Sequence, residues 1–186
     1  MKKLLMIAAI ALPLMWTACG EDKPVETEDI IPKGMRAVDL QMGDMGFPVK
    51  INVPDSTNGM VDTVVTPNGI QVKVGNNFDL LVNVGGAEES DLAAVKSLVE
   101  ATDAGMSSFT VNDATTLVWE TKFGEGEGAL SVYHFYTLVK VGNDTYYVRD
   151  NYIDPNNQFK KADVDRMLES AKSVRANKAA ATEPEA

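Results

Sequence analysis

The sequence has one cysteine, one histidine and fewer basic than acidic residues, and each shortage excludes a class of function. One cysteine among 186 residues excludes an internal disulfide bond, a CxxC redox pair and a zinc site built from several cysteines. One histidine excludes metal sites made of histidine clusters and leaves a single candidate for a histidine base. The 17 Lys and Arg residues against 27 Asp and Glu residues give a net charge of −10, which disfavours nucleic acid as a partner.

Long hydrophobic runs are also missing. The apolar stretch at residues 4–16 is too short for a transmembrane helix, which needs about 20 such residues. It follows the basic start Met1-Lys2-Lys3 and precedes small residues, and this pattern is typical of a secretory signal peptide. We therefore predict that residues 1–18 are a signal peptide.

Cys19 lies where the processing site of such a peptide belongs. The stretch from Trp16 to Gly20 resembles the lipobox of bacterial lipoproteins, in which small residues precede a cysteine that is lipidated and becomes the mature N-terminus. Thr17 and Ala18 match that pattern, whereas Trp16 stands where the family usually has Leu or another aliphatic residue. The resemblance implies a lipid anchor, with palmitate among its acyl chains, on Cys19. The alternative is an ordinary signal peptidase site of the small-x-small type, with Cys19 incidental.

The segment behind Cys19 is acidic and lacks aromatic residues. Residues 20–29 contain five acids and one base, so they cannot bury enough apolar surface to offset the entropy of the chain. We assign residues 19–45 to a flexible acidic tether attached to the lipid, although Met35, Met42 and Met45 either pack on the domain or continue the tether. Acidic residues behind the lipidated cysteine also resemble the surface-export signal of lipoproteins in certain Gram-negative bacteria. This resemblance implies the outer membrane, with the cell surface favoured over the periplasmic face; the alternative is a solvated spacer.

From about residue 47, apolar and polar residues alternate with a period of two, which is typical of strands with one buried face. Three segments, at 47–53, 70–74 and 78–84, predict an antiparallel meander, and residues 61–65 predict a short extra strand. A helical stripe of apolar residues then predicts a helix at about 91–102. The remaining expected elements are strands at 106–111, 115–122, 130–141 and 145–149, with a hairpin turn at 142–144, and a second helix at about 160–175.

This order predicts an α+β domain over residues 46–176, in which a twisted, mostly antiparallel sheet is covered by the two helices. The order of elements is similar to that of the PsbP-like fold, a family of small extracytoplasmic or regulatory proteins. The resemblance implies a sandwich and a role in binding or assembly, although a fold alone does not fix a function. Residues 177–186 are small and polar, and we expect a disordered tail.

Three motifs contain residues that chemical sites use, and the pattern of each favours a structural role. The Gly-Glu repeat at 124–128 leads into a strand and carries carboxylates, so it does not fit a phosphate loop. Residues 150–157 collect oxygen ligands but lack the spacing of a calcium loop, and such residues are common in turns. His134 lies between aromatic residues and the chain has no G-x-S-x-G motif, so we expect a packed histidine rather than a general base. We predict no catalytic residue, metal or cofactor.

Aromatic residues gather late in the chain, and the strand at 130–141 is apolar on both faces. Either it is a central strand covered on both sides, or its aromatic residues line a ligand or partner groove. The candidate surface consists of Trp119, Tyr133, Phe135, Tyr136, Tyr146 and Tyr147.

These observations favour a non-enzymatic lipoprotein, held in the membrane by the lipid on Cys19 and acting as a binding or assembly module with another protein of the bacterial cell envelope. The alternative is a small ligand-binding protein or hydrolase whose aromatic groove lies near Trp119, Tyr133, Tyr136 and Tyr146.

Overall fold

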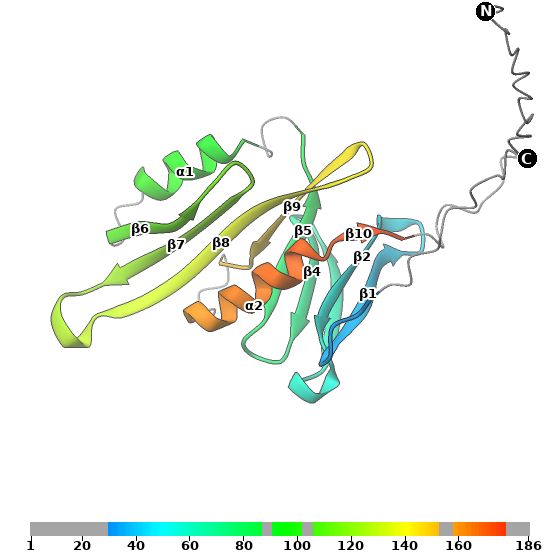
Figure 1. Cartoon of the computed structure of the whole chain (residues 1–186), viewed down its shortest axis with the longest axis horizontal. Helices are drawn as coiled ribbons and strands as arrows, with labels where there is room; N and C mark the ends of the chain where they lie inside the picture. The colour runs from blue at the N-terminus through cyan, green and yellow to red at the C-terminus, as the bar shows by residue number, and fades with distance from the viewer. Residues whose placement is uncertain (1–29, 87–90, 102–105, 153–157, 178–186) are drawn as a thin grey trace, which may run out of the picture. The chain divides into compact units, whose positions relative to one another are not determined.

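The computed structural model describes residues 30–86, 91–101, 106–152 and 158–177 (Figure 1). The predicted signal peptide, Cys19 and the first part of the predicted tether lie outside these ranges, as do residues 178–186. The chain divides into residues 1–30 and a compact unit from Ile31 onward, which contains every described helix and strand. Neither of the two described α-helices has the length and apolar content that a membrane span requires.

The described residues form ten strands and two α-helices, which confirms the predicted α+β class. Both helices and the extra strand at 61–65 lie where the periodicity of the sequence predicts them. In chain order the elements are β1 (Met35–Met42), β2 (Met45–Pro54), β3 (Val61–Thr66), β4 (Gly69–Val74), β5 (Asp79–Val84), α1 (Leu92–Ala101), β6 (Met106–Asn112), β7 (Thr116–Phe123), β8 (Leu130–Val141), β9 (Asp144–Asp150), α2 (Lys161–Lys172) and β10 (Arg175–Ala176).

Seven strands form one antiparallel sheet in the order β3-β4-β5-β9-β8-β7-β6 (Figure 1). The two central strands β8 and β9 form the expected hairpin, in which Val141 pairs with Asp144. The turn between them contains Gly142 at φ +61°, a conformation that costs glycine little. This short turn fixes which residues of β8 and β9 lie opposite one another.

A second, three-stranded antiparallel sheet has the order β1-β2-β10. The prediction of a tether through residue 45 is wrong, because residues 35–42 form β1 and bury Val38 and Leu40. Polar residues alternate with these two, so the period-two pattern begins one strand earlier than predicted. The predicted meander is wrong in one pairing: β2 pairs with β1 and β10, while β3 occupies the edge of β4.

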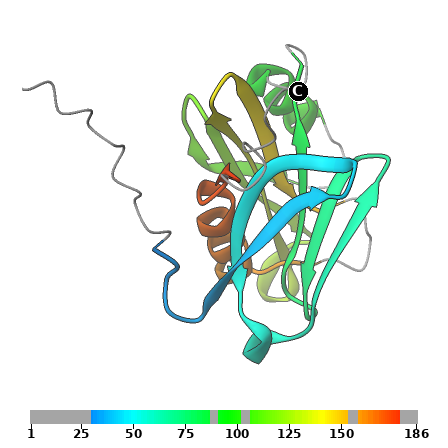
Figure 2. The ribbon, with the colours of Figure 1, turned by 90° about the vertical axis from the view of Figure 1, so that its right-hand side faces the viewer.

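Helix α2 lies against one face of the large sheet and also contacts the small sheet (Figures 1 and 2). It buries Val164, Met167 and Ala171 in a hydrophobic core that includes Ile51 of β2 and Phe135 of β8. Because one helix packs on strands of both sheets, α2 holds the two sheets together.

Helix α1 covers the opposite face of the large sheet. Val118 of β7 belongs to the core under α2, whereas its neighbours Leu117 and Trp119 pack with Val95 and Val99 of α1. Successive residues of a strand point to opposite faces, so the two helices lie on different sides of the sheet. No residue of α1 is fully buried, whereas α2 buries five.

The end of the described chain departs slightly from the prediction. Helix α2 ends at Lys172, three residues early, because Arg175 and Ala176 form β10 and pair with β2. The backbone N–H of Asn177 then donates to the carbonyl oxygen of Pro48 at 2.9 Å, so Asn177 belongs to the domain and not to the predicted tail.

Replacing Met167 with alanine should lower the free energy of unfolding by about 2–5 kcal/mol, the usual cost of emptying such a core site. The Met167 side chain is fully buried between α2 and the strands. Replacing the exposed Glu169 of the same helix with alanine is the matched control and should change stability by less than about 0.5 kcal/mol. Urea denaturation followed by circular dichroism measures both values. Equal unfolding midpoints for the two variants would contradict the position of α2 in the core.

Candidate functional site

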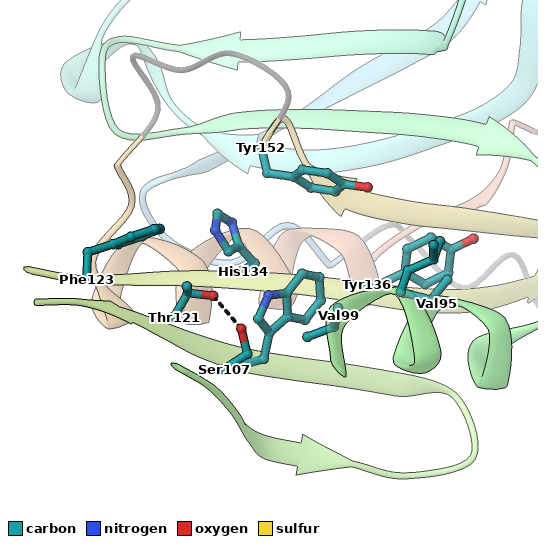
Figure 3. A pocket seen from close by; sticks show the side chains of 10 residues that line it. Val95, Val99, Ser107, Thr121, Phe123, His134, Tyr136 and Tyr152 are labelled. Atoms are coloured by element: carbon teal, nitrogen blue, oxygen red, sulfur yellow. Dashed lines mark hydrogen bonds between the residues drawn. The ribbon is translucent and has the colours of Figure 1, made fainter. Parts of the chain in front are cut away.

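A cavity of about 260 Å³ lies between α1 and the face of the large sheet that this helix covers (Figure 3). We call it the α1 cavity. Its lining is mostly apolar and comes from α1, β6, β7, β8 and the residue Tyr152 after β9. The apolar lining residues are Val95, Leu98, Val99, Trp119, Phe123, Tyr136 and Tyr152. Three polar side chains, those of Ser107, Thr121 and His134, complete the lining.

His134 is held by a buried carboxylate. Its Nδ1 atom lies 2.8 Å from Oδ2 of Asp150, whose side chain is 0% exposed. A carboxylate only accepts hydrogen bonds, so Nδ1 carries the proton and donates it to Asp150. In neutral histidine this leaves Nε2 as a hydrogen-bond acceptor.

The position of Asp150 follows from the pairing of the two central strands. Asp150 is the last residue of β9, and its second carboxylate oxygen, Oδ1, accepts the backbone N–H of Phe135 at 2.8 Å. Each oxygen of this buried carboxylate thus has its own donor, one from the backbone of β8 and one from the side chain of His134. Burial of an ionised carboxylate is tolerated only with such partners.

The two hydroxyl groups of the cavity belong to residues that face each other on neighbouring strands. Ser107 of β6 pairs with Thr121 of β7, and their hydroxyl oxygens lie 3.1 Å apart (Figure 3). Among the described residues, neither hydroxyl is hydrogen-bonded to His134. A histidine base activates a hydroxyl nucleophile through such a bond, and in the described residues His134 makes none with Ser107 or Thr121.

Aromatic rings surround the histidine. The His134 ring centroid lies 5.4 Å from that of Trp119 and 5.8 Å from that of Tyr152, which meets it edge-on. The guanidinium group of Arg149 lies over the ring of Tyr152, and its central carbon, Cζ, is 4.7 Å from the centroid of that ring. Aromatic and cation–π contacts of this kind fix ring orientations, so the walls around His134 are set by several neighbours.

The six aromatic residues predicted to share one surface divide between the two faces of the sheet. Trp119 and Tyr136 line the α1 cavity, and Tyr147 lies on the same face, stacked on Tyr136 with ring centroids 5.6 Å apart. Phe135 and Tyr146 are buried in the core under α2 instead. This placement corrects the predicted surface, because alternation along β8 and β9 sends neighbouring aromatic residues to opposite sides.

Tyr133 also packs against the core under α2. Its hydroxyl donates to Oε1 of Glu120 at 3.0 Å, and this hydrogen bond raises the pKa of the Tyr133 phenol. Burial likewise raises the pKa of Tyr146. Neither residue lines the α1 cavity. Of the four residues predicted near an aromatic groove, Trp119 and Tyr136 line this cavity, and the prediction is wrong for Tyr133 and Tyr146.

Sequence reasoning missed the contact between His134 and Asp150, and one signal could have found it. The hairpin turn at 142–143 places residues at equal distances on either side of it opposite one another, so Phe135 faces Asp150 and His134 is its neighbour. The role of Asp150 also bears on the calcium loop considered at 150–157, because both of its oxygens already accept hydrogen bonds from the protein. Residues 153–157 lie outside the described ranges, and in the rest no cluster of three acidic, cysteine or histidine residues could hold a metal ion.

No protein-family model, no curated protein and no solved structure matches this chain. The resemblances to bacterial lipoproteins and to the PsbP-like fold therefore stay predictions.

Replacing Asp150 with alanine should lower the free energy of unfolding by about 2–5 kcal/mol, because one buried and one partly buried donor lose their acceptor. The donors are Nδ1 of His134 and the N–H of Phe135. Replacing Asp165 with alanine removes only an exposed ion pair with Lys161 and should cost no more than about 0.5 kcal/mol. Urea denaturation compares the two variants, and an Asp150 variant as stable as the Asp165 variant would show that the buried hydrogen bonds contribute nothing.

Proposed function

We propose that this chain is a lipid-anchored protein of the bacterial cell envelope that binds a small, mostly apolar ligand in the α1 cavity. The observation that carries the proposal is the cavity itself, which combines apolar walls with a few oriented polar groups, the usual make-up of a ligand site. Its volume of about 260 Å³ lies just below the range of about 300–1,000 Å³ for drug-sized ligands. A ligand of one or two rings fits this size.

The packing of α1 supports binding at this place. Leu98 lines the cavity and yet the residue is 70% exposed, so the cavity opens to solvent beside the helix. A ligand in the cavity would remove part of this apolar surface from water, which favours binding. The absence of a hydrogen bond between His134 and either cavity hydroxyl, among the described residues, favours binding over hydrolysis.

The anchor and the location rest on the N-terminal residues. The basic start, the short apolar stretch and Cys19 support lipidation, and more than one acyl chain gives stable membrane attachment. The acidic run behind Cys19 supports the outer membrane, with the domain at the cell surface. Removal of residues 1–18 takes away two lysines and no acid, so the net charge falls from −10 to −12 and keeps the domain off anionic lipid.

Replacing Cys19 with serine should abolish labelling of the protein by a radioactive fatty acid, because serine offers no thiol for the thioether. Protease added to intact cells that carry the wild-type protein should digest the domain, because it faces outward. Equal labelling of the two forms would refute the anchor. A domain that stays intact until the outer membrane is permeabilised would place it in the periplasm.

Ligand binding can be followed by fluorescence, because removal of residues 1–18 leaves Trp119 as the only tryptophan and it lines the cavity. Titration of residues 20–186 with small aromatic compounds should give a saturable change in Trp119 emission. Val99→Phe fills the cavity and should weaken binding at least about tenfold, since a misfit of this size costs over about 1.4 kcal/mol. Ser97→Phe, on the exposed side of the same helix, is the control and should bind like the wild type. Equal effects of the two substitutions would place the ligand elsewhere.

A further inference from the structure

We propose that the ligand of the α1 cavity is a small phenol, whose hydroxyl group donates a hydrogen bond to Nε2 of His134. This inference rests on the proposed function and adds the chemical class of the ligand. The starting point is Nε2 of His134, because the hydrogen bond from Nδ1 of the same ring to Asp150 makes Nε2 the acceptor in neutral His134.

Asp150 determines which kind of group His134 can recognise. Because its Oδ2 accepts from Nδ1 at 2.8 Å, neutral His134 has its proton on Nδ1 and a lone pair on Nε2. Asp150 is fully buried, and its other oxygen accepts the N–H of Phe135. Both carboxylate oxygens therefore act as acceptors, and neither donates a hydrogen to His134. The tautomer is therefore set, and Nε2 selects a ligand that donates.

The charge of the pair selects a neutral donor. The carboxylate of Asp150 hydrogen-bonds the imidazole and disfavours an anionic ligand at Nε2. The guanidinium group of Arg149, stacked over Tyr152, has the opposite charge and opposes this effect, so neither sign of ligand charge is favoured overall. An ammonium group would have to leave water for a mostly apolar cavity, which costs more than transfer of a hydroxyl group. A hydroxyl group meets both conditions.

The walls of the cavity select an aromatic body for that hydroxyl group. Four aromatic residues line the cavity: Trp119 and, labelled in Figure 3, Phe123, Tyr136 and Tyr152. Rings prefer edge-to-face or offset contacts with other rings, and Tyr152 already meets His134 in this way. A phenol stays neutral near pH 7, since the pKa of such a hydroxyl is about 10.

The test compares 4-ethylphenol with 4-ethylanisole, the methyl ether that cannot donate. Calorimetric titration of residues 20–186 should show that the wild type binds the phenol about three- to tenfold more tightly, the range expected for one neutral hydrogen bond. The extra methyl group of the ether affects every variant, so the change in the ratio of the two affinities between variants isolates the hydrogen bond.

Asp150→Asn should abolish this preference. The amide oxygen must still accept the N–H of Phe135, so the amide nitrogen donates to Nδ1 of His134 and the ring proton moves to Nε2. Nε2 then donates, and both probes can accept. Asp165→Asn, a matched change on the exposed face of α2, should keep the wild-type ratio. His134→Phe removes the acceptor nitrogen without changing Asp150 and should lose the preference as well.

The outcomes separate this inference from the proposed function. Binding of both probes with the same ratio of affinities in the wild type, Asp150→Asn and His134→Phe overturns the phenol and leaves the cavity as a ligand site. Tighter binding of the ether than of the phenol by the wild type overturns the phenol in the same way. Binding of neither probe to the folded wild type overturns both proposals.

Discussion

Strand β8 is covered on both of its faces, and this constraint organises the rest of the domain. Phe135 points into the core under α2, while His134 and Tyr136 point toward α1. Along its two hydrogen-bonding edges β8 pairs with β7 and β9, so both of its faces lie in the interior of the sheet and both must be covered. Each side then needs its own cover, which is why the two helices lie on opposite faces of one sheet.

The two helices that cover the sheet differ in how closely they pack against it. We relate the closely packed helix α2 to the stability of the domain and the loosely packed helix α1 to ligand binding. Helix α2 has five buried residues and contacts strands of both sheets. Helix α1 buries none completely and leaves a cavity of about 260 Å³ beneath it. A close-packed core has little room for a ligand without a large loss of stability. The loosely covered face can accept one at smaller cost, so the site lies where the fold depends least on packing.

The helices and strands could be predicted from the local periodicity of apolar residues. The site could not be predicted in this way, because its residues come together through pairing between strands that are apart in the sequence. Alternation of apolar and polar residues located β3, β8 and both helices within a few residues. It failed for the partner of β2, since alternation shows that a segment is a strand without showing which strand lies beside it. The predicted aromatic surface failed in Phe135 and Tyr146 for a related reason: adjacent aromatic residues of one strand belong to different faces.

Asp150 connects the fold and the site through a single side chain. One oxygen holds the backbone of β8 at Phe135, and the other fixes the ring of His134. The next residue but one, Tyr152, borders the cavity and contacts the same histidine. A buried carboxylate costs free energy of desolvation that only its hydrogen bonds offset. If the backbone bond were its whole purpose, an uncharged acceptor would serve with less desolvation. The second donor accounts for the second carboxylate oxygen, because an ionised carboxylate has no hydrogen to donate, so Nδ1 of His134 carries the proton and the lone pair of the neutral ring lies on Nε2.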